Sequence, residues 1–162
     1  MMHIREEAPA DAPVIAELVH LALGTRATHS PAARMRDGTR PIAGLCLIAA
    51  NGTGTVVGTL RFWPIRIGTT PALQLGPLAV RPERRGEGFG KALLRAGLDL
   101  ARDSGHRIVV LIGDPTYYRA VGFEPAVPRG IRLPTPDDET RLQVLELLPG
   151  ALDGIGGQVG PA

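Results

Sequence analysis

The chain has 162 residues, of which 44% are hydrophobic and 21% charged, a composition typical of one globular domain with one core. A net charge of +2 is too small to indicate nucleic-acid binding, so we expect no nucleic-acid partner. The single cysteine, Cys46, leaves no internal disulfide, and its apolar surroundings predict a buried thiol. The sequence shows no signal peptide and no apolar run of about 18 residues, so we expect a cytoplasmic protein without a membrane partner.

The first quarter of the chain predicts a short extended segment, a helix and a polar stretch. Residues 3–9 are extended and end at a proline. Apolar residues at helical spacing predict a helix over 11–24, with Asp11 as its N-cap. The stretch 25–41 is polar and rich in arginine, and a short helix is expected at 31–37.

The next segment predicts a β-hairpin and a third strand. Residues 42–51 and 55–68 are strand-like and are joined by the turn "NGTG" at 51–54, in which Asn-Gly is a strong hairpin signal. A third strand is expected over 71–82, with an interruption at Gly76-Pro77.

The second half of the chain alternates helices and strands. A helix is predicted over 89–103, where apolar and charged residues take opposite faces, and a strand buried on both faces over 106–114. A short helix is expected at 115–123. Late strands are expected at 130–134 and 141–150.

This order of elements predicts a mixed sheet with helices packed on it. We expect one domain over residues 1–150, because no linker and no internal repeat interrupts the chain. The glycine-rich residues 151–162 are expected to form a loosely held C-terminal tail.

The stretch "RRGEGFGKALL" at 84–94 carries three alternating glycines before an apolar helix pattern. A P-loop needs a glycine where Arg85 stands and a hydroxyl where Ala92 stands, so two of its fixed positions fail. A dinucleotide-binding loop needs a third glycine where Lys91 stands. Both of these nucleotide-binding motifs are therefore disfavoured.

The pattern R-x-x-G-x-G is satisfied by Arg85, Gly88 and Gly90, and it lies between a strand and a helix. The first turn of a helix leaves backbone N–H groups without partners, and glycines let a pyrophosphate approach them closely. The stretch is therefore interpreted as a phosphate-binding loop. A plain strand-to-helix turn with a solvated basic rim is the alternative.

Residues 78–105, "LAVRPERRGEGFGKALLRAGLDLARDSG", resemble the acetyl-CoA motif of the GNAT N-acetyltransferase superfamily. The segment "YYRAVGF" at 117–123 is similar to a later motif of that family, at the correct spacing. The resemblance implies an α/β (α+β) fold with a mixed, mostly antiparallel central sheet, splayed in the middle, and helices on both faces. It also implies acetyl-CoA as cosubstrate. No spacing of His, Cys and Asp residues suggests a metal site, so no metal is expected.

The resemblance assigns roles to particular positions. The backbone at Leu78, Ala79 and Val80 would pair with the pantetheine arm, and the amides from Gly86 to Lys91 would hold the pyrophosphate. Tyr118 would be the general acid that protonates the leaving thiolate, and Tyr117 would take the family's packing position. The expected cofactor-binding residues are Leu78, Ala79, Val80, Arg85, Gly86, Glu87, Gly88, Phe89, Gly90 and Lys91.

The general base is left open between Glu83, Asp114 and water. Many relatives place a glutamate on the strand before the loop, but residues 73–80 contain no acid. Glu83 lies in the turn beyond that strand and is interpreted as a solvated charge, and Asp114 as the cap of the helix that begins at Pro115.

The expected function is transfer of an acetyl group from acetyl-CoA to a primary amine, directly through a tetrahedral intermediate. The amine belongs to a small molecule or to a protein, and a homodimer is left open. The arginines of 25–41 either favour an anionic acceptor or form a solvated surface. The alternative function is a non-catalytic acyl-CoA-binding module that acts as a sensor or scaffold.

Overall fold

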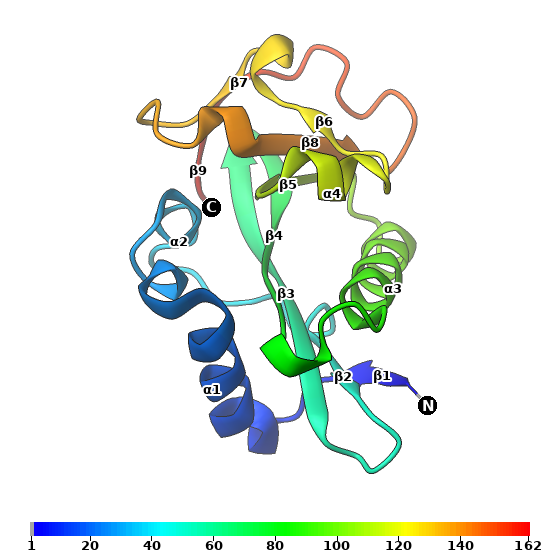
Figure 1. Ribbon diagram of the computed structural model, residues 1–162. Coiled ribbons are helices and arrows are strands. Elements are labelled where there is room, and N and C mark those ends of the chain that lie inside the picture. The colour runs from blue at the N-terminus through cyan, green and yellow to red at the C-terminus, as the bar shows by residue number, and fades with distance from the viewer. Residues whose placement is uncertain (1) are drawn as a thin grey trace.

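The structure is a computed structural model and describes residues 2–162. Its centre is one sheet with the strand order β1-β2-β3-β4-β5-β8-β6, and β9 joins β3 to β7 beside this path (Figure 1). Neighbours along the path are antiparallel, except β4 and β5, which are parallel. The strands are β1 (His3–Glu6), β2 (Leu47–Ala50), β3 (Val56–Ile67), β4 (Thr70–Val80), β5 (Ile108–Ile112), β6 (Glu124–Pro125), β7 (Ile131–Arg132), β8 (Leu142–Glu146) and β9 (Gly157–Pro161).

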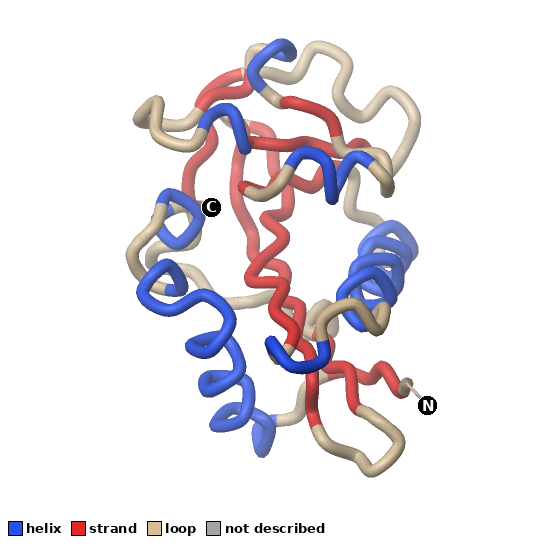
Figure 2. Tube along the Cα trace, viewed as in Figure 1, coloured by secondary structure: helices blue, strands red, loops and turns tan. Residues whose placement is uncertain are grey.

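Helices cover both faces of the sheet, as Figures 1 and 2 show. On β2, Leu47 and Ala49 pack with the helix α3, whereas Ile48 and Ala50 pack with α1 on the other face, as the alternation of a strand requires. The expected fold class is confirmed. The helices are α1 (Ala12–Leu23), α2 (Pro31–Arg34), α3 (Phe89–Asp103) and α4 (Pro115–Arg119), with short 3-10 turns η1 (Pro9–Asp11), η2 (Gly24–Ala27), η3 (Pro82–Arg84), η4 (Val127–Arg129) and η5 (Glu139–Arg141).

Most predicted elements are confirmed, and the differences lie mainly at their ends. The helix predicted over 89–103 has those bounds, and the hairpin forms between β2 and β3. The short helices α2 and α4 end earlier than expected, at Arg34 and Arg119. No helix within residues 2–162 combines the length and the apolar character needed to cross a membrane.

Asp11 is the N-cap residue of α1, as expected, but its side chain does not cap the helix. Its carboxylate accepts no hydrogen bond from the helix. It accepts bonds from Arg5 Nη1 at 2.8 Å, from Arg5 Nη2 at 3.0 Å and from the Ala8 N–H at 2.7 Å. Arg5, followed by the Ala8 N–H, lowers the pKa of Asp11 to about 2. The carboxylate therefore ties β1 to the start of α1.

The expectation of a loosely held tail over 151–162 is wrong. Strand β9 pairs with the end of β3 and with β7, and Val159 is fully buried. The glycines permit this packing, because a Cβ at Gly157 would lie 3.2 Å from the Cα of Gly68. The same composition that indicated mobility therefore allows two backbones to approach closely.

The splay of the sheet arises between β4 and β5. These strands pair only at Leu73 with Val109 and at Gln74 with Val110. Just beyond, β4 carries an extra residue relative to β3 at Gly76-Pro77, and such a bulge bends a strand. The remainder of β4 stays paired with β3 but diverges from β5, which leaves one edge of β4 open.

A substitution at Gly97 tests how closely α3 packs on the sheet. A Cβ there would lie 2.6 Å from Leu60 Cδ2 and 2.9 Å from Phe62 Cε2, and both of those side chains are fully buried. We expect Gly97→Ala to lower the free energy of unfolding by about 1–2 kcal/mol, because overpacking outweighs the helix propensity that alanine adds.

Urea denaturation measures this change, and Arg95→Ala at an exposed position of the same helix is the control, expected within about 0.5 kcal/mol of wild type. A Gly97→Ala variant as stable as wild type would contradict the close packing.

Candidate active site

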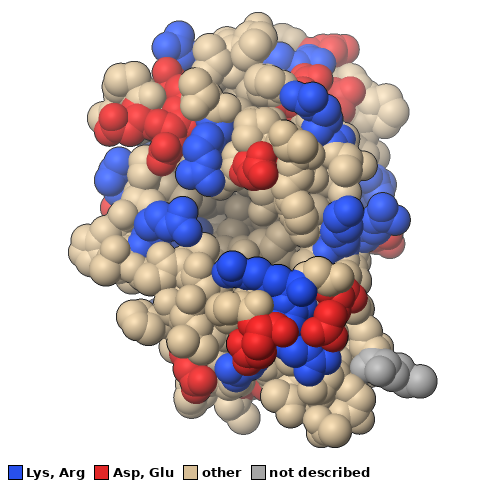
Figure 3. Space-filling model, viewed as in Figure 1, with Lys and Arg blue, Asp and Glu red and all other residues tan. Residues whose placement is uncertain are grey.

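A cleft of about 1020 Å³ opens where β4 and β5 diverge. Its walls come from the open edge of β4, the loop before α3, the end of β5 with α4, and the segment from η2 to α2. Figure 3 shows this face with a central hollow bordered by basic side chains. The cleft therefore joins groups from both faces of the sheet at one place.

The open edge of β4 presents backbone hydrogen-bonding groups to the cleft. The Arg81 N–H bonds to the Val57 carbonyl of β3, at 2.8 Å. Because successive residues of a strand direct their N–H and C=O groups to opposite edges, those of Val80 and Leu78 point away from β3. An extended ligand in the cleft can therefore bond to β4 as an added strand does.

The loop before α3 has the conformation expected of an anion-binding site. Gly86 and Gly88 have φ values of +84° and +90°, which side-chain-bearing residues rarely adopt. The first bond within α3 runs from the Ala92 N–H to the Gly88 carbonyl, at 3.0 Å. The N–H groups of Phe89, Gly90 and Lys91 precede it and have no acceptor within the helix, and all three residues line the cleft.

The charged side chains of this loop differ in whether they pair within the protein or line the cleft. Arg84 bonds to Glu87 at 2.8 Å and lies over the Phe89 ring at 5.4 Å, so it is held by the protein itself. Arg85 and Lys91 are exposed and line the cleft. Glu87 is the one residue of 85–91 that does not line it. The loop therefore offers two cations and a row of amides.

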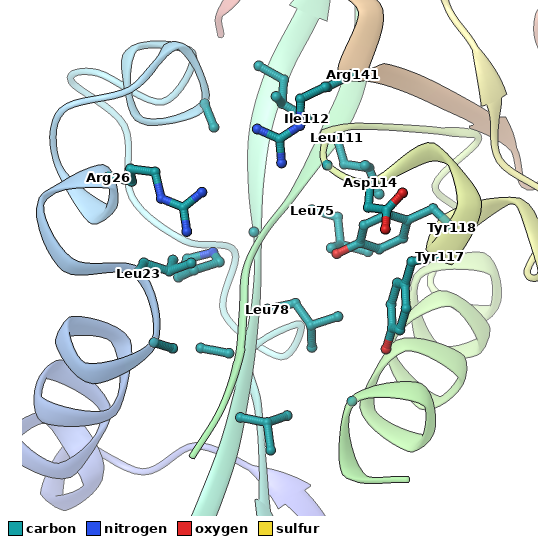
Figure 4. A pocket seen from close by; sticks show the side chains of 18 of the residues that line it. Leu23, Arg26, Leu75, Leu78, Leu111, Ile112, Asp114, Tyr117, Tyr118 and Arg141 are labelled. Carbon is teal, nitrogen blue, oxygen red and sulfur yellow. The ribbon is translucent and has the colours of Figure 1, made fainter. Parts of the chain in front are cut away.

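Two tyrosines of α4 line the cleft. Figure 4 shows the Tyr118 hydroxyl pointing into the cleft toward β4, and the Tyr117 hydroxyl pointing toward the start of α3. The Tyr118 ring makes edge contacts with Tyr117, at 4.9 Å between centroids, and with the buried Phe123, at 5.8 Å. The core thus fixes the ring and leaves its hydroxyl in the cleft.

Burial raises the pKa of Tyr118 well above its usual value, and the nearby Tyr117 and Asp114 act in the same direction. Arg141 opposes them. The hydroxyl of Tyr118 therefore stays protonated at neutral pH and is available as a hydrogen-bond donor.

Two glycines allow the tyrosines to lie where they do. A Cβ at Gly113 would come within 2.6 Å of Tyr118 Cε2, and one at Gly90 within 2.9 Å of the Tyr117 hydroxyl. Gly113 was not among the expected site residues. The sequence feature that could have identified Gly113 is its position between the buried strand β5 and the capping Asp114.

The acidic groups of the cleft differ from those expected. Asp114 lines the cleft and also caps α4, because its Oδ1 accepts the Thr116 N–H at 3.0 Å, as predicted. Glu83 is exposed in η3 and does not line the cleft. Asp138, directly before η5, lines the cleft, although sequence reasoning missed it.

Other reactive groups lie outside the cleft. In the part of the chain that the structure describes, no three His, Cys, Asp or Glu side chains gather as metal ligands would. Cys46 is buried, as predicted, and burial raises its pKa to about 11, so it stays a neutral thiol.

Three arginines line the cleft away from the glycine loop. Arg26 and Arg36 belong to the polar stretch identified in the sequence, whereas Arg34 and Arg40 of that stretch do not line the cleft. Arg141 comes from η5 and was missed, because nothing local distinguishes it from a surface arginine.

Comparison with known proteins agrees with this geometry. The sequence model of the "Acetyltransferase (GNAT) family" matches residues 14–123. The chain is 34% identical to the uncharacterized N-acetyltransferase YhbS of Escherichia coli K12, over 98% of this chain and 95% of that protein.

Two crystal structures are similar over almost the whole chain. The structure of YhbS from Escherichia coli in complex with CoA has a TM-score of 0.84 at 32% identity, covering 99% of this chain and 89% of that one. The structure of a GNAT family acetyltransferase from Brucella melitensis in complex with acetyl-CoA has a TM-score of 0.76 at 33% identity, covering 100% and 96%. These likenesses confirm the expected enzyme class, an acyltransferase, and the chain therefore belongs to the GNAT family of acetyltransferases.

Proposed function

We propose that this protein transfers an acetyl group from acetyl-CoA to a primary amine, by direct attack within the cleft. The observation that carries the proposal is the meeting of three parts in one cleft: an open β4 edge, an anion-binding loop and the Tyr118 hydroxyl. The CoA and acetyl-CoA complexes of the two similar bacterial proteins support the identity of the donor.

The donor would lie along β4 with its phosphates on the loop. The peptide groups of Leu78 and Val80 are open to the pantetheine arm, and Ala79 between them also lines the cleft. Amides from Gly86 to Lys91, Glu87 included, would hold the pyrophosphate, with positive charge added by Arg85 and Lys91. The helix dipole of α3 favours the same anion.

The reaction needs an uncharged amine and a stabilised oxyanion. The amine nitrogen attacks the thioester carbonyl carbon, and the Val80 N–H at the open edge would donate to the resulting oxyanion. The C–S bond then breaks, sulfur takes the electron pair, and an N–C bond remains. The proton lost by nitrogen balances the thiolate, which yields free CoA thiol.

Tyr118 would act on the sulfur. A CoA thiol has a pKa near the value of about 8.5 for cysteine, which lies below that of the buried tyrosine. Complete proton transfer from Tyr118 to sulfur is therefore uphill, and the hydroxyl stabilises the departing thiolate chiefly as a hydrogen-bond donor. Asp114 lies beside Tyr118 in the cleft (Figure 4) and is proposed to accept the amine proton, directly or through water.

An acceptor screen tests the proposed function directly. Incubation with acetyl-CoA and a broad panel of primary amines is expected to release CoA thiol with at least one of them, measured with a thiol reagent. Binding of acetyl-CoA without turnover on any amine would favour the non-catalytic module. If acetyl-CoA does not raise the Tm at all, the donor assignment is wrong.

A substitution at Gly88 tests whether the loop binds acetyl-CoA, and the same substitution at Gly105, at the other end of α3, is a matched control. Both have φ of +90°, and neither has an atom within 4 Å of an added Cβ. Alanine at either position should therefore cost a similar free energy of unfolding, about 1 kcal/mol. Only Gly88→Ala is expected to weaken acetyl-CoA binding, by about tenfold, in isothermal titration calorimetry. Equal affinities of the two variants would remove the loop from the donor site.

Tyr118→Phe is expected to lower kcat by about 10²-fold, because the departing sulfur loses its hydrogen-bond donor. The KM for acetyl-CoA should stay close to that of wild type. Tyr117→Phe provides the comparison, since that hydroxyl points toward α3, and its effect on kcat should be several-fold at most. Equal kcat values for wild type and Tyr118→Phe would exclude the residue from the chemistry.

The pH profile gives a second measurement on the same residue. The active form of Tyr118 is protonated, and its raised pKa moves the loss of that proton to higher pH. For wild type, kcat/KM should therefore rise as the amine loses its proton and show no decline up to about pH 10. A decline near pH 8 that disappears in Tyr118→Phe would contradict this assignment.

A further inference from the structure

The cleft has an unusual excess of unpaired positive charge on the side away from the phosphate-binding loop. Arg26, Arg36 and Arg141 line it there. Within residues 2–162, none of the three forms an ion pair with an acidic side chain. The two carboxylates that line the cleft are those of Asp114 and Asp138, and Asp114 is engaged by the Thr116 N–H. This side of the cleft therefore carries a net positive charge.

Arg36 is positioned by Trp63 and forms no ion pair with an acidic side chain of the described residues. Its guanidinium lies 5.1 Å from the centre of the Trp63 ring, and the Trp63 indole N–H is fixed on the Gly76 carbonyl at 2.6 Å. Among the described residues, the buried Nη1 of Arg36 has no acceptor. Burial lowers the pKa of Arg36, and the nearby Arg61 adds to that effect. The Nη2 of Arg36 donates to the Ala27 carbonyl at 3.5 Å, so Arg36 is a half-buried cation with no ion-pair partner in residues 2–162 and one unbonded nitrogen, which makes this part of the cleft favourable for an anion.

Arg26 and Arg141 have the freedom to contact a ligand. Figure 4 shows their guanidinium groups extending into the same space, one from η2 and the other from η5. Arg26 is exposed, so a small molecule can reach it without a change in the fold. Two guanidinium groups that converge in this way suit the two oxygens of a carboxylate.

The position of these arginines separates them from the donor phosphates. Arg26 and Arg36 come from the segment that follows α1, on the sheet face opposite α3, whereas the glycine loop leads directly into α3. A donor whose phosphates lie on the loop would thus extend its thioester toward the gap between β4 and β5. The arginines would then face the acceptor from the other side.

We propose that the acceptor is a small primary amine that carries a carboxylate, bound by Arg26 and Arg141 and favoured by the charge of Arg36. This inference rests on the proposed function and adds the chemical class of its acceptor. The acceptor is small because the cleft, at about 1020 Å³, also has to hold the donor from its pyrophosphate to its thioester.

The test compares matched acceptors. Amino carboxylates with spacers of increasing length are each paired with the corresponding carboxamide, and kcat/KM is measured by thiol release. We expect at least one acid to exceed its amide by about tenfold or more. Arg26→Gln should remove that preference by lowering kcat/KM for the acid. The kcat/KM for the amide and the KM for acetyl-CoA should stay unchanged. Arg34→Gln, an exposed change in α2 that does not touch the cleft, should keep the preference.

Arg141→Gln gives a second variant, expected to reduce the same preference. Thiol release with no difference between acids and amides would overturn the inference and leave the proposed function intact, as would a preference for acidic peptides over every small acid. If no amine releases thiol, the proposed function fails, and the Tm of the CoA-loaded protein decides the inference. A larger Tm increase with acids than with amides in wild type, absent in Arg26→Gln, supports it, and equal increases overturn it.

Discussion

The brief pairing of β4 with β5 is the constraint on which the candidate site depends. Two residues of each strand meet, at Leu73–Val109 and Gln74–Val110, and the bulge at Gly76-Pro77 then carries β4 away. Exposed backbone groups at the edge of a strand normally invite another strand. Here β4 and β5 diverge between helices that pack on both faces of the sheet, and the open edge of β4 is available to a ligand.

The gap also brings together two charge environments that belong to different faces of the sheet. The α3 side supplies backbone amides, a helix dipole, Arg85 and Lys91, which together suit a multiply charged phosphate. The α1 side supplies Arg26, which is exposed, and Arg36, which lies over the Trp63 ring, where a single charge has more effect because the surroundings are less polar. Tyr118 lies between them, uncharged and anchored by Phe123. Under the proposed function, the sheet would separate the donor from the acceptor except at the gap.

Local patterns in the sequence were sufficient for the parts of the site that depend on backbone conformation. The glycine spacing at 86–90, the helix over 89–103 and the Asp114 cap each follow from the preferences of a few adjacent residues. Interactions between distant segments were not predictable in this way. Arg141 lies near Tyr118 because β8 pairs with β5. The Asp11 carboxylate bonds to Arg5 of β1 and not to the N–H groups of α1. The packing of the C-terminal segment was missed for the same reason, since its partners in β3 are some 90 residues away and those in β7 are 26 residues away.

That pairing of β9 with β3 has a consequence for how the chain reaches its folded state. The end of β3 is synthesised early, but its partners in β9 emerge from the ribosome about 90 residues later. The paired residues are Ile65 with Pro161, Arg66 with Gly160 and Ile67 with Val159. Until then one end of β3 exposes apolar side chains that β9 and β7 later cover. Contacts between residues so distant in sequence slow folding, because a long loop must close first. The sheet can therefore begin to form during synthesis, but the core around β9 closes only after residues 157–161 have been made.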